Sequence, residues 1–245
     1  MVMALCGAEE LNPRVVLDEA HAAYEKKDYA SALQKVTWFW NNAVKIDQSL
    51  IGVRGSDART LFYLIQKESP DGKALYVKTM NTALADSLAD LTDPASMTGI
   101  QLPANHTNFL DYLALAEKVQ SDEEIVDNFK KLDAVNPKLA KWEYAAVADH
   151  LLKEKEFTFM NKFVEPWPLK EKELISSMLM DYRMLRDSKM TEAGSLDYEV
   201  NNLRIIKIVY AQNGRKNDEM LLDFFCRMHL TDSERAEIDG PKGNF

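Results

Sequence analysis

Residues Arg14 to Ser69 decide the fold: RVVLDEAHAAYEKKDYASALQKVTWFWNNAVKIDQSLIGVRGSDARTLFYLIQKES. In the first part of this stretch, apolar or small side chains recur at i, i+3, i+4 and i+7, as in an amphipathic helix, at Val16, Leu17, Ala20, Ala23 and Tyr24. A second helix follows the turn at Lys27-Asp28 and directs a similar set inward, namely Ala32, Leu33, Val36, Phe39, Trp40 and Ala43. A third helix is predicted over 49–68. The stretch therefore predicts a helical hairpin with a further helix beside it.

The rest of the chain continues the same helical rhythm. Helices are predicted over 73–90, 106–119, 122–134, 137–152, 157–164, 169–187, 197–212 and 216–229. The sequence Ser69-Pro70-Asp71-Gly72 is a turn signal that separates the third helix from the fourth. We find no strand signal. The predicted fold is all-α, built from stacked antiparallel helix pairs.

Segments with few helix signals divide the chain. The longest is 91–105, which holds two prolines and a glycine and is the place for a hinge or lobe boundary. We expect a single helical domain over 14–230, with sub-lobes 14–90 and 106–230 joined by this connection. An N-terminal arm, 1–13, precedes the domain, and a polar tail, 231–245, follows it and is expected to fray.

Composition restricts the partners. The net charge of −9 argues against nucleic acid, which needs concentrated Lys and Arg, and against an anionic membrane surface. No segment approaches the ~20 apolar residues of a membrane span. We therefore expect a protein or peptide partner, with no nucleic acid and no membrane.

Two features bear on the compartment. Cys6 and Cys226 lie near opposite ends of the chain, unlike a secreted disulfide framework, so we interpret both as free thiols of a cytoplasmic protein. The apolar start Met1–Leu5 faintly resembles the end of a signal peptide, although it lacks a basic region and is shorter than the usual apolar core. Export of a protein with a truncated signal is the alternative.

The helix pairs resemble the tetratricopeptide repeat, a helix–turn–helix unit with a period of roughly 34 residues. In the first unit Ala20 falls at the close-packing glycine position, Lys27 replaces the turn glycine, and Ala32-Leu33 matches the alanine-centred contact. In a second unit the repeat positions are occupied by Phe109, Leu113, Ala116, Ile125, Phe129, Leu132 and the terminal Pro137. A third unit has Ala148, Leu151, Phe157, Met160 and Val164 at such positions. A fourth unit has Leu203, Tyr210 and Gly214. The register slips twice, so the resemblance implies a degenerate α-solenoid with a concave surface.

One segment has a more particular resemblance. Trp38-Phe39-Trp40 with Ala43, followed by Ser49-Leu50-Ile51-Gly52-Val53-Arg54, Ser56 and Ala58, is similar to a W-F-x-x-x-A block and an S-L-x-G-V-R-x-S-x-A block. These blocks occur in a group of uncharacterised bacterial tetratricopeptide-like proteins. The similarity is clearest over 14–66 and looser over 106–165. Trp40 stands where that group leads us to expect a histidine, and Gly55 interrupts a helical stretch. The resemblance implies fold and class, and no chemistry.

Motifs for catalysis or cofactor binding are missing from the sequence. No phosphate loop, dinucleotide fingerprint, zinc-protease helix or nucleophile elbow is present. We therefore predict no enzyme activity, no catalytic residue and no cofactor.

Histidine and cysteine pairs give no complete metal site. His21 lies four residues before Glu25 and three after Asp18, geometries that hold a metal only when further ligands converge. Cys226 and His229 form a lone C-x-x-H without the second half that zinc sites need. We predict no metal, and a buried Cys226 thiol near a helix end.

Candidate binding residues come from two places. The resemblance implies that the first helix of a pair lines the groove, which gives Leu17, His21 and Tyr24; the first two differ from the Lys and Asn of carboxylate-binding repeats. Arg54 and Arg59 follow a glycine-bearing corner, where Arg54 reaches either a partner's carboxylate or, as we favour, an internal one. The sequence thus predicts an interaction scaffold. The alternatives are a helical-stack enzyme or small-ligand sensor near His21 and Arg54, and self-association through an apolar face.

Overall fold

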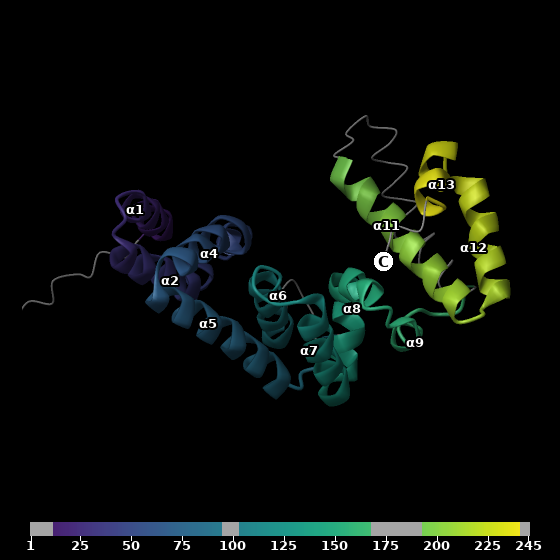
Figure 1. Cartoon of the computed structure of the whole chain (residues 1–245), viewed down its shortest axis with the longest axis horizontal. Helices are drawn as coiled ribbons and strands as arrows, with labels where there is room; N and C mark the ends of the chain where they lie inside the picture. The colour runs from purple at the N-terminus through teal and green to yellow at the C-terminus, as the bar shows by residue number, and fades with distance from the viewer. Residues whose placement is uncertain (1–11, 95–102, 168–192, 241–245) are drawn as a thin grey trace, which may run out of the picture. The chain divides into compact units, whose positions relative to one another are not determined.

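The computed structural model describes residues 12–94, 103–167 and 193–240, and all regular elements in these ranges are helical. The predicted all-α class is confirmed. Contacts between residues divide the chain into two compact units, Met1–Gln120 (unit 1) and Ser121–Phe245 (unit 2). Figure 1 follows the helices of both units in chain order.

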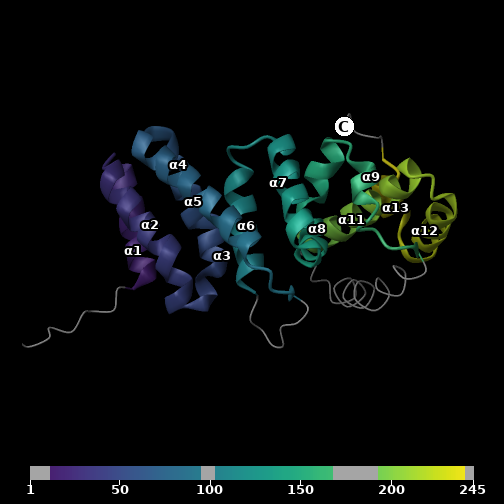
Figure 2. The ribbon, with the colours of Figure 1, turned by 90° about the horizontal axis from the view of Figure 1, so that it is seen from below.

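Unit 1 is a row of helices in which each packs on the next. Its elements are α1 (Pro13–Glu25), α2 (Tyr29–Ile46), the 3-10 turn η1 (Gln48–Leu50), α3 (Ile51–Val53), the π-helical turn η2 (Arg54–Ala58), α4 (Arg59–Glu68), α5 (Pro70–Ala89) and α6 (Ala104–Ala116). Helix α1 packs on α2, α2 on α4, α4 on α5 and α5 on α6, and Figure 2 shows these helices side by side.

The α1–α2 hairpin follows from a few local preferences. Between the helices, Lys27 takes a left-handed backbone conformation, with φ of 61°, where a glycine is usual. The Asp28 carboxylate then caps α2 by accepting a hydrogen bond from the Ser31 N–H at 3.1 Å. Ala20 and Ala32 are fully buried, and their small side chains allow the two helices to approach closely.

Aromatic rings fill the centre of unit 1. Phe62 meets Tyr76 edge to face, with ring centroids 5.1 Å apart, and Trp40 at 6.2 Å. The Tyr76 hydroxyl donates a hydrogen bond to the Leu115 carbonyl at 3.0 Å, and burial raises the Tyr76 pKa above its ordinary value. This bond joins α5 to α6 across the row.

The expected turn at 69–72 is wrong in detail, because these residues begin α5. The Ser69 hydroxyl accepts a hydrogen bond from the Gly72 N–H at 3.2 Å, and Pro70 occupies the first helical turn, where its missing N–H costs nothing. Gly72 allows α4 and α5 to approach closely, since an added Cβ would lie 3.0 Å from the Ile65 carbonyl oxygen of α4. Serine, proline and glycine therefore start a helix at this corner.

The contacts also place the division of the chain elsewhere than expected. The 91–105 connection lies inside unit 1, since α5 and α6 on its two sides pack together. The Asn105 side chain donates hydrogen bonds to the carbonyls of Asp90 (3.0 Å) and Thr92 (2.8 Å), which ties the two ends of the connection. The division at Gln120–Ser121 falls within the segment predicted as the second repeat unit, Phe109 to Pro137.

Unit 2 contains α7 (Asp122–Val135), α8 (Pro137–Lys153), α9 (Phe157–Met160), α11 (Ala193–Gln212), α12 (Lys216–His229) and α13 (Asp232–Ile238). A capping box of Ser121 and Glu124 starts α7, which matches the helix predicted over 122–134, and α7 packs on α8 as a hairpin. The helix predicted over 169–187 lies outside the described residues.

Helix α9 is a single turn, shorter than the predicted 157–164, and residues 161–163 continue it as turns. Arg215 binds the chain that follows α9. The guanidinium donates to the Asn161 side chain (3.0 Å) and to the carbonyls of Val164 (2.9 Å) and Glu165 (3.2 Å). It also lies over the Tyr210 ring, 4.2 Å from the centroid. These bonds fasten residues 161–165 to the start of α12.

The tail is more ordered than expected, because 232–238 form α13. Thr231 and Glu234 cap each other's backbone N–H groups at its start, and Ile238 is buried. Lys207 of α11 pairs with Asp223 at 2.6 Å and with Asp239, just beyond α13, at 2.5 Å. Residues 1–11 and 241–245 lie outside the described ranges.

Candidate functional site

The residues expected in the groove of the first hairpin have different environments. Leu17 is buried on the face of α1 that packs on α2, so it belongs to the core. His21 is half-exposed, and its Nε2 lies 2.9 Å from Asp57 of the π-helical turn. The ring of Tyr24 is partly covered by Tyr29, with centroids 5.7 Å apart. Of the three residues, His21 and Tyr24 are partly exposed and Leu17 is buried.

Arg54 makes an internal salt bridge. Its Nη2 lies 2.8 and 2.7 Å from the two carboxylate oxygens of Asp111 on α6, and the guanidinium sits 5.3 Å from the centre of the Trp40 ring. The side chains of Arg54 and Asp111 are only 12% and 18% exposed. Burial raises the Asp111 pKa to about 6 even though Arg54 opposes the rise.

Arg59 and His21 do not join Arg54 in one site. Arg59 begins α4, and its Nε is buried without an acceptor among the described residues. The carboxylate partners of His21 and Arg54 are different residues, Asp57 and Asp111. Nowhere in the described ranges do three or more His, Cys, Asp or Glu side chains converge as a metal site would require.

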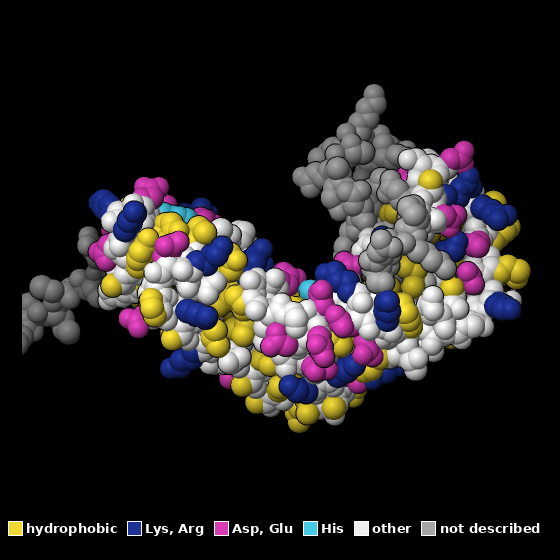
Figure 3. Space-filling view, in the orientation of Figure 1, with side chains coloured by type: hydrophobic (Ala, Val, Ile, Leu, Met, Phe, Trp, Pro, Cys, Tyr) yellow, Lys and Arg dark blue, Asp and Glu magenta, His cyan; other side chains and the backbone are white. Residues whose placement is uncertain are grey.

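An apolar face of α12 is the clearest candidate surface. Met220, Phe224 and Met228 are 60%, 64% and 65% exposed, and their four-residue spacing places them along one side of the helix. We call these three residues the α12 face. Leu222, Phe225 and Cys226 are buried on the other side. In Figure 3, hydrophobic side chains lie at the surface over α12, between lysine and arginine side chains.

Charged side chains border the α12 face. A shallow groove of about 330 Å³ is lined by Lys216, Glu219, Met220, Asp223, Phe224 and Arg227. Lys216 and Arg227 are exposed, whereas Asp223 is paired with Lys207. Our sequence analysis missed this surface, although a signal was present: the run Met220–Met228 is apolar on both sides of the helix, more than one buried face requires.

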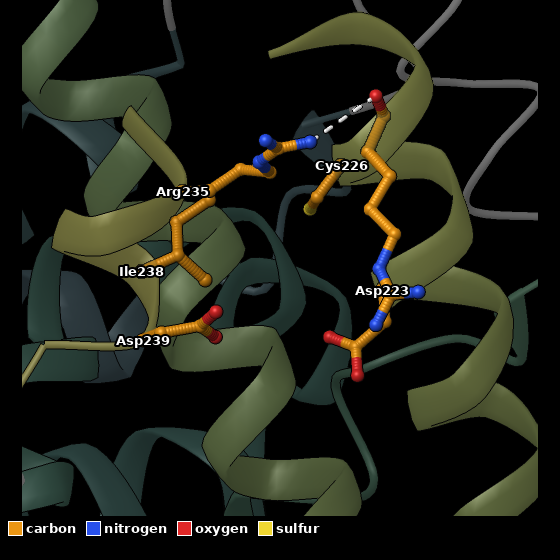
Figure 4. A pocket seen from close by; sticks show the side chains of 6 residues that line it. Asp223, Cys226, Arg235, Ile238 and Asp239 are labelled. Atoms are coloured by element: carbon orange, nitrogen blue, oxygen red, sulfur yellow. Dashed lines mark hydrogen bonds between the residues drawn. The ribbon is translucent and has the colours of Figure 1, made fainter. Parts of the chain in front are cut away.

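A second pocket lies between α12 and α13. Figure 4 shows Asp223, Cys226, Arg235, Ile238 and Asp239 around it, with Arg235 bonded to the Arg227 carbonyl at 3.4 Å. Its volume of about 240 Å³ is below the usual range for small-molecule sites.

The thiol in that pocket is structural. Cys226 is buried, as the sequence predicts, and burial raises its pKa to about 11. A thiol with this pKa is almost entirely protonated at neutral pH, and is therefore a poor nucleophile and a poor metal ligand.

Comparison with protein-family models, with curated proteins and with solved structures finds no match to this chain. None of the described helices has the length and hydropathy to cross a membrane.

Proposed function

We propose that the chain is a cytoplasmic interaction scaffold that binds a protein or peptide partner, with helix pairs arranged as in tetratricopeptide-like repeats. The α1–α2 hairpin supports the repeat proposal, because it combines a short turn with fully buried alanines at the helix crossing. The α7–α8 hairpin is a second pair of this kind. Row packing of such pairs leaves helix surfaces free for partners.

One observation carries the binding function: the exposed α12 face. Large apolar side chains that are exposed together on one side of a helix mark interaction surfaces. Their contact with water is unfavourable, and a partner that covers them removes this cost. Phe224 is the natural anchor, since aromatic residues dominate binding energy at interfaces. An enzyme or ligand sensor near His21 and Arg54 has no comparable support, because Arg54 is engaged by Asp111.

Affinity capture from a lysate of the source cells tests this function. The wild-type chain is compared with Phe224→Ser and with Leu91→Ser, a control that removes an equally exposed leucine (66%) from unit 1. A double variant, His21→Ala/Tyr24→Ala, tests the first hairpin. We expect one partner to be retained by the control and lost with Phe224→Ser or with the double variant. Capture that none of these substitutions changes would contradict the proposal.

A further inference from the structure

Resting on the proposed scaffold function, we infer that the α12 face receives an amphipathic helix whose apolar stripe is flanked by carboxylates. Met220 to Met228 spans ~12 Å of helix axis, or about two turns. This matches the helix-in-groove mode of recognition, in which a partner helix inserts apolar side chains at i, i+4 and similar spacings. Met220 and Met228, on either side of Phe224, have flexible thioethers that adapt to varied apolar side chains.

The charges beside the α12 face indicate which sign of charge a partner should carry. Lys216 and Arg227 project near the apolar stripe, and no ion pair is formed by either one within the described part of the chain. Of the two carboxylates in the groove, Asp223 is bound by Lys207, which also pairs with Asp239, and Glu219 forms no ion pair within the described part of the chain. The lining thus carries two cations and two carboxylates, but around the helix axis Lys216 and Arg227 lie closer to the apolar stripe than Glu219 and Asp223 do, so a partner helix on the stripe meets the cations first.

The spacing of these cations sets the spacing of the partner's carboxylates. Lys216 and Arg227 are separated by ~16 Å along the helix axis, about three turns. Acidic side chains three turns apart on one flank of a partner helix would meet both cations. Carboxylates at such positions also give specificity and a faster association rate, because opposite potentials steer the encounter.

A second copy of the chain fits this surface poorly. A two-fold pairing of parallel α12 helices would bring Lys216 against Lys216 and Arg227 against Arg227. An antiparallel pairing that overlays the two charged spans would bring Lys216 against Arg227 of the other copy. Like charges opposed in this way disfavour association. The chemistry of the groove therefore favours a different, acidic helix.

A displayed peptide library tests the inference. Each peptide is about 18 residues, long enough to be substantially helical, and carries a fixed stripe of Leu, Met or Phe. Its flank positions vary among Glu, Lys, Gln and Ala. The library is selected on the full chain, and the same library is selected on Arg227→Glu. We expect Glu to be enriched on one flank with the wild type, and that enrichment to be lost or replaced by Lys with Arg227→Glu.

Affinities of a selected acidic peptide then locate the site. Phe224→Ser should weaken binding by about thirtyfold or more, as for an anchor residue, and Leu91→Ser should leave binding unchanged. Thermal unfolding of Phe224→Ser should match the wild type, since that side chain is 64% exposed. Added salt should weaken the wild-type complex more than the complex with Arg227→Glu.

Failure of the acidic-helix inference and failure of the scaffold function give different results. Peptides that need Phe224 but show no acidic preference would overturn the partner chemistry and leave the scaffold function intact. A library that yields no Phe224-dependent binder would overturn the inference, and lysate capture would decide the scaffold function separately. Concentration-dependent dimerisation that Phe224→Ser abolishes would show that a second copy occupies the face, and would also overturn the inference.

Discussion

Removing one partner of the Arg54–Asp111 pair at a time tests how unit 1 holds charge in its interior. In Asp111→Ala the Arg54 guanidinium loses its carboxylate while remaining almost enclosed, with 12% of its side chain exposed. A cation of this kind cannot lose its proton at ordinary pH. We expect the free energy of unfolding to fall by ~3–5 kcal/mol, the usual cost of an uncompensated buried charge.

Arg54→Ala should cost less near neutral pH, because a carboxyl group can take up a proton. Burial raises the Asp111 pKa from 3.8 to about 6 in the wild type, and Arg54 limits this rise. This rise in pKa corresponds to at most ~3 kcal/mol of free energy, which is the cost of keeping Asp111 ionised in the folded state. Without Arg54 the pKa rises further, so the carboxyl is protonated at pH 6 and the cost is largely avoided.

The pH dependence has a definite sign. Since the folded pKa of Asp111 is above its unfolded value, the folded state holds a proton that the unfolded state has released. This contribution to stability is complete below pH 4 and is lost as pH rises through about 6 in the wild type. In Arg54→Ala the loss should extend to higher pH. In Asp111→Ala this component of the pH dependence should be absent.

Hydrogen exchange measured by mass spectrometry gives the free energy of opening for the peptides of α2 and α6, between pH 5 and pH 8. Exchange rates are corrected for their intrinsic pH dependence. The matched control is Arg54→Met/Asp111→Leu, which removes both charges and should recover most of the stability lost in Asp111→Ala. The reasoning is refuted if the double variant is as unstable as Asp111→Ala, or if Arg54→Ala shows the wild-type pH profile.

Three further predictions concern packing and reactivity. Gly72→Ala should lower the free energy of unfolding by ~1–3 kcal/mol, because its Cβ would meet Ile65, whereas Gly52→Ala, with no atom within 4 Å, should leave stability unchanged or raise it by up to ~1 kcal/mol; thermal unfolding measures both. Arg215→Ala should remove hydrogen-exchange protection from residues 161–165 at a cost of ~2–3 kcal/mol, and Arg215→Lys should not restore it, because lysine lacks the planar fork of donors; intact protection in either variant would contradict the role of this side chain. Cys226 should react with iodoacetamide at pH 8 at least ~100-fold more slowly in the folded than in the unfolded chain, as measured on the Cys226 peptide by mass spectrometry; comparable rates would show that the thiol is neither buried nor protonated.

Much of the fold could be predicted because its signals are local. The apolar rhythm at Leu17 and Ala20 identifies α1 since a helix needs one buried face, and the Ser121–Glu124 capping box fixes the start of α7. The same kind of signal was available at Thr231 and Glu234 but was outweighed by the polar composition of the tail.

The pairing of helices could not be predicted, because composition shows where helices stop and not which helices touch. The 91–105 connection has prolines and a glycine, yet long-range bonds such as Tyr76 to Leu115 keep α5 and α6 together. Serine, proline and glycine at 69–72 suit a turn and a helix start equally, so only the close approach of α4 distinguishes them.

Electrostatic pairs at the candidate sites are equally hidden from the sequence. His21 and Asp57 are 36 residues apart, and Arg54 and Asp111 are 57 apart, so no spacing rule connects them. Leu17 shows the opposite error, since the groove position that the repeat resemblance implies is a core position here. The α12 face, by contrast, follows from a single helical run and could have been identified.

The hydrogen bonds from Asn105 to Asp90 and Thr92 have a practical consequence for protein engineering. They fasten the chain just after α5 to the chain at the start of α6. Doubling a loop that is already closed costs only ~0.6 kcal/mol in chain entropy. A reporter sequence, an epitope or a small domain can therefore be inserted between residues 94 and 103, and unit 1 should tolerate it while the Asn105 side chain is kept.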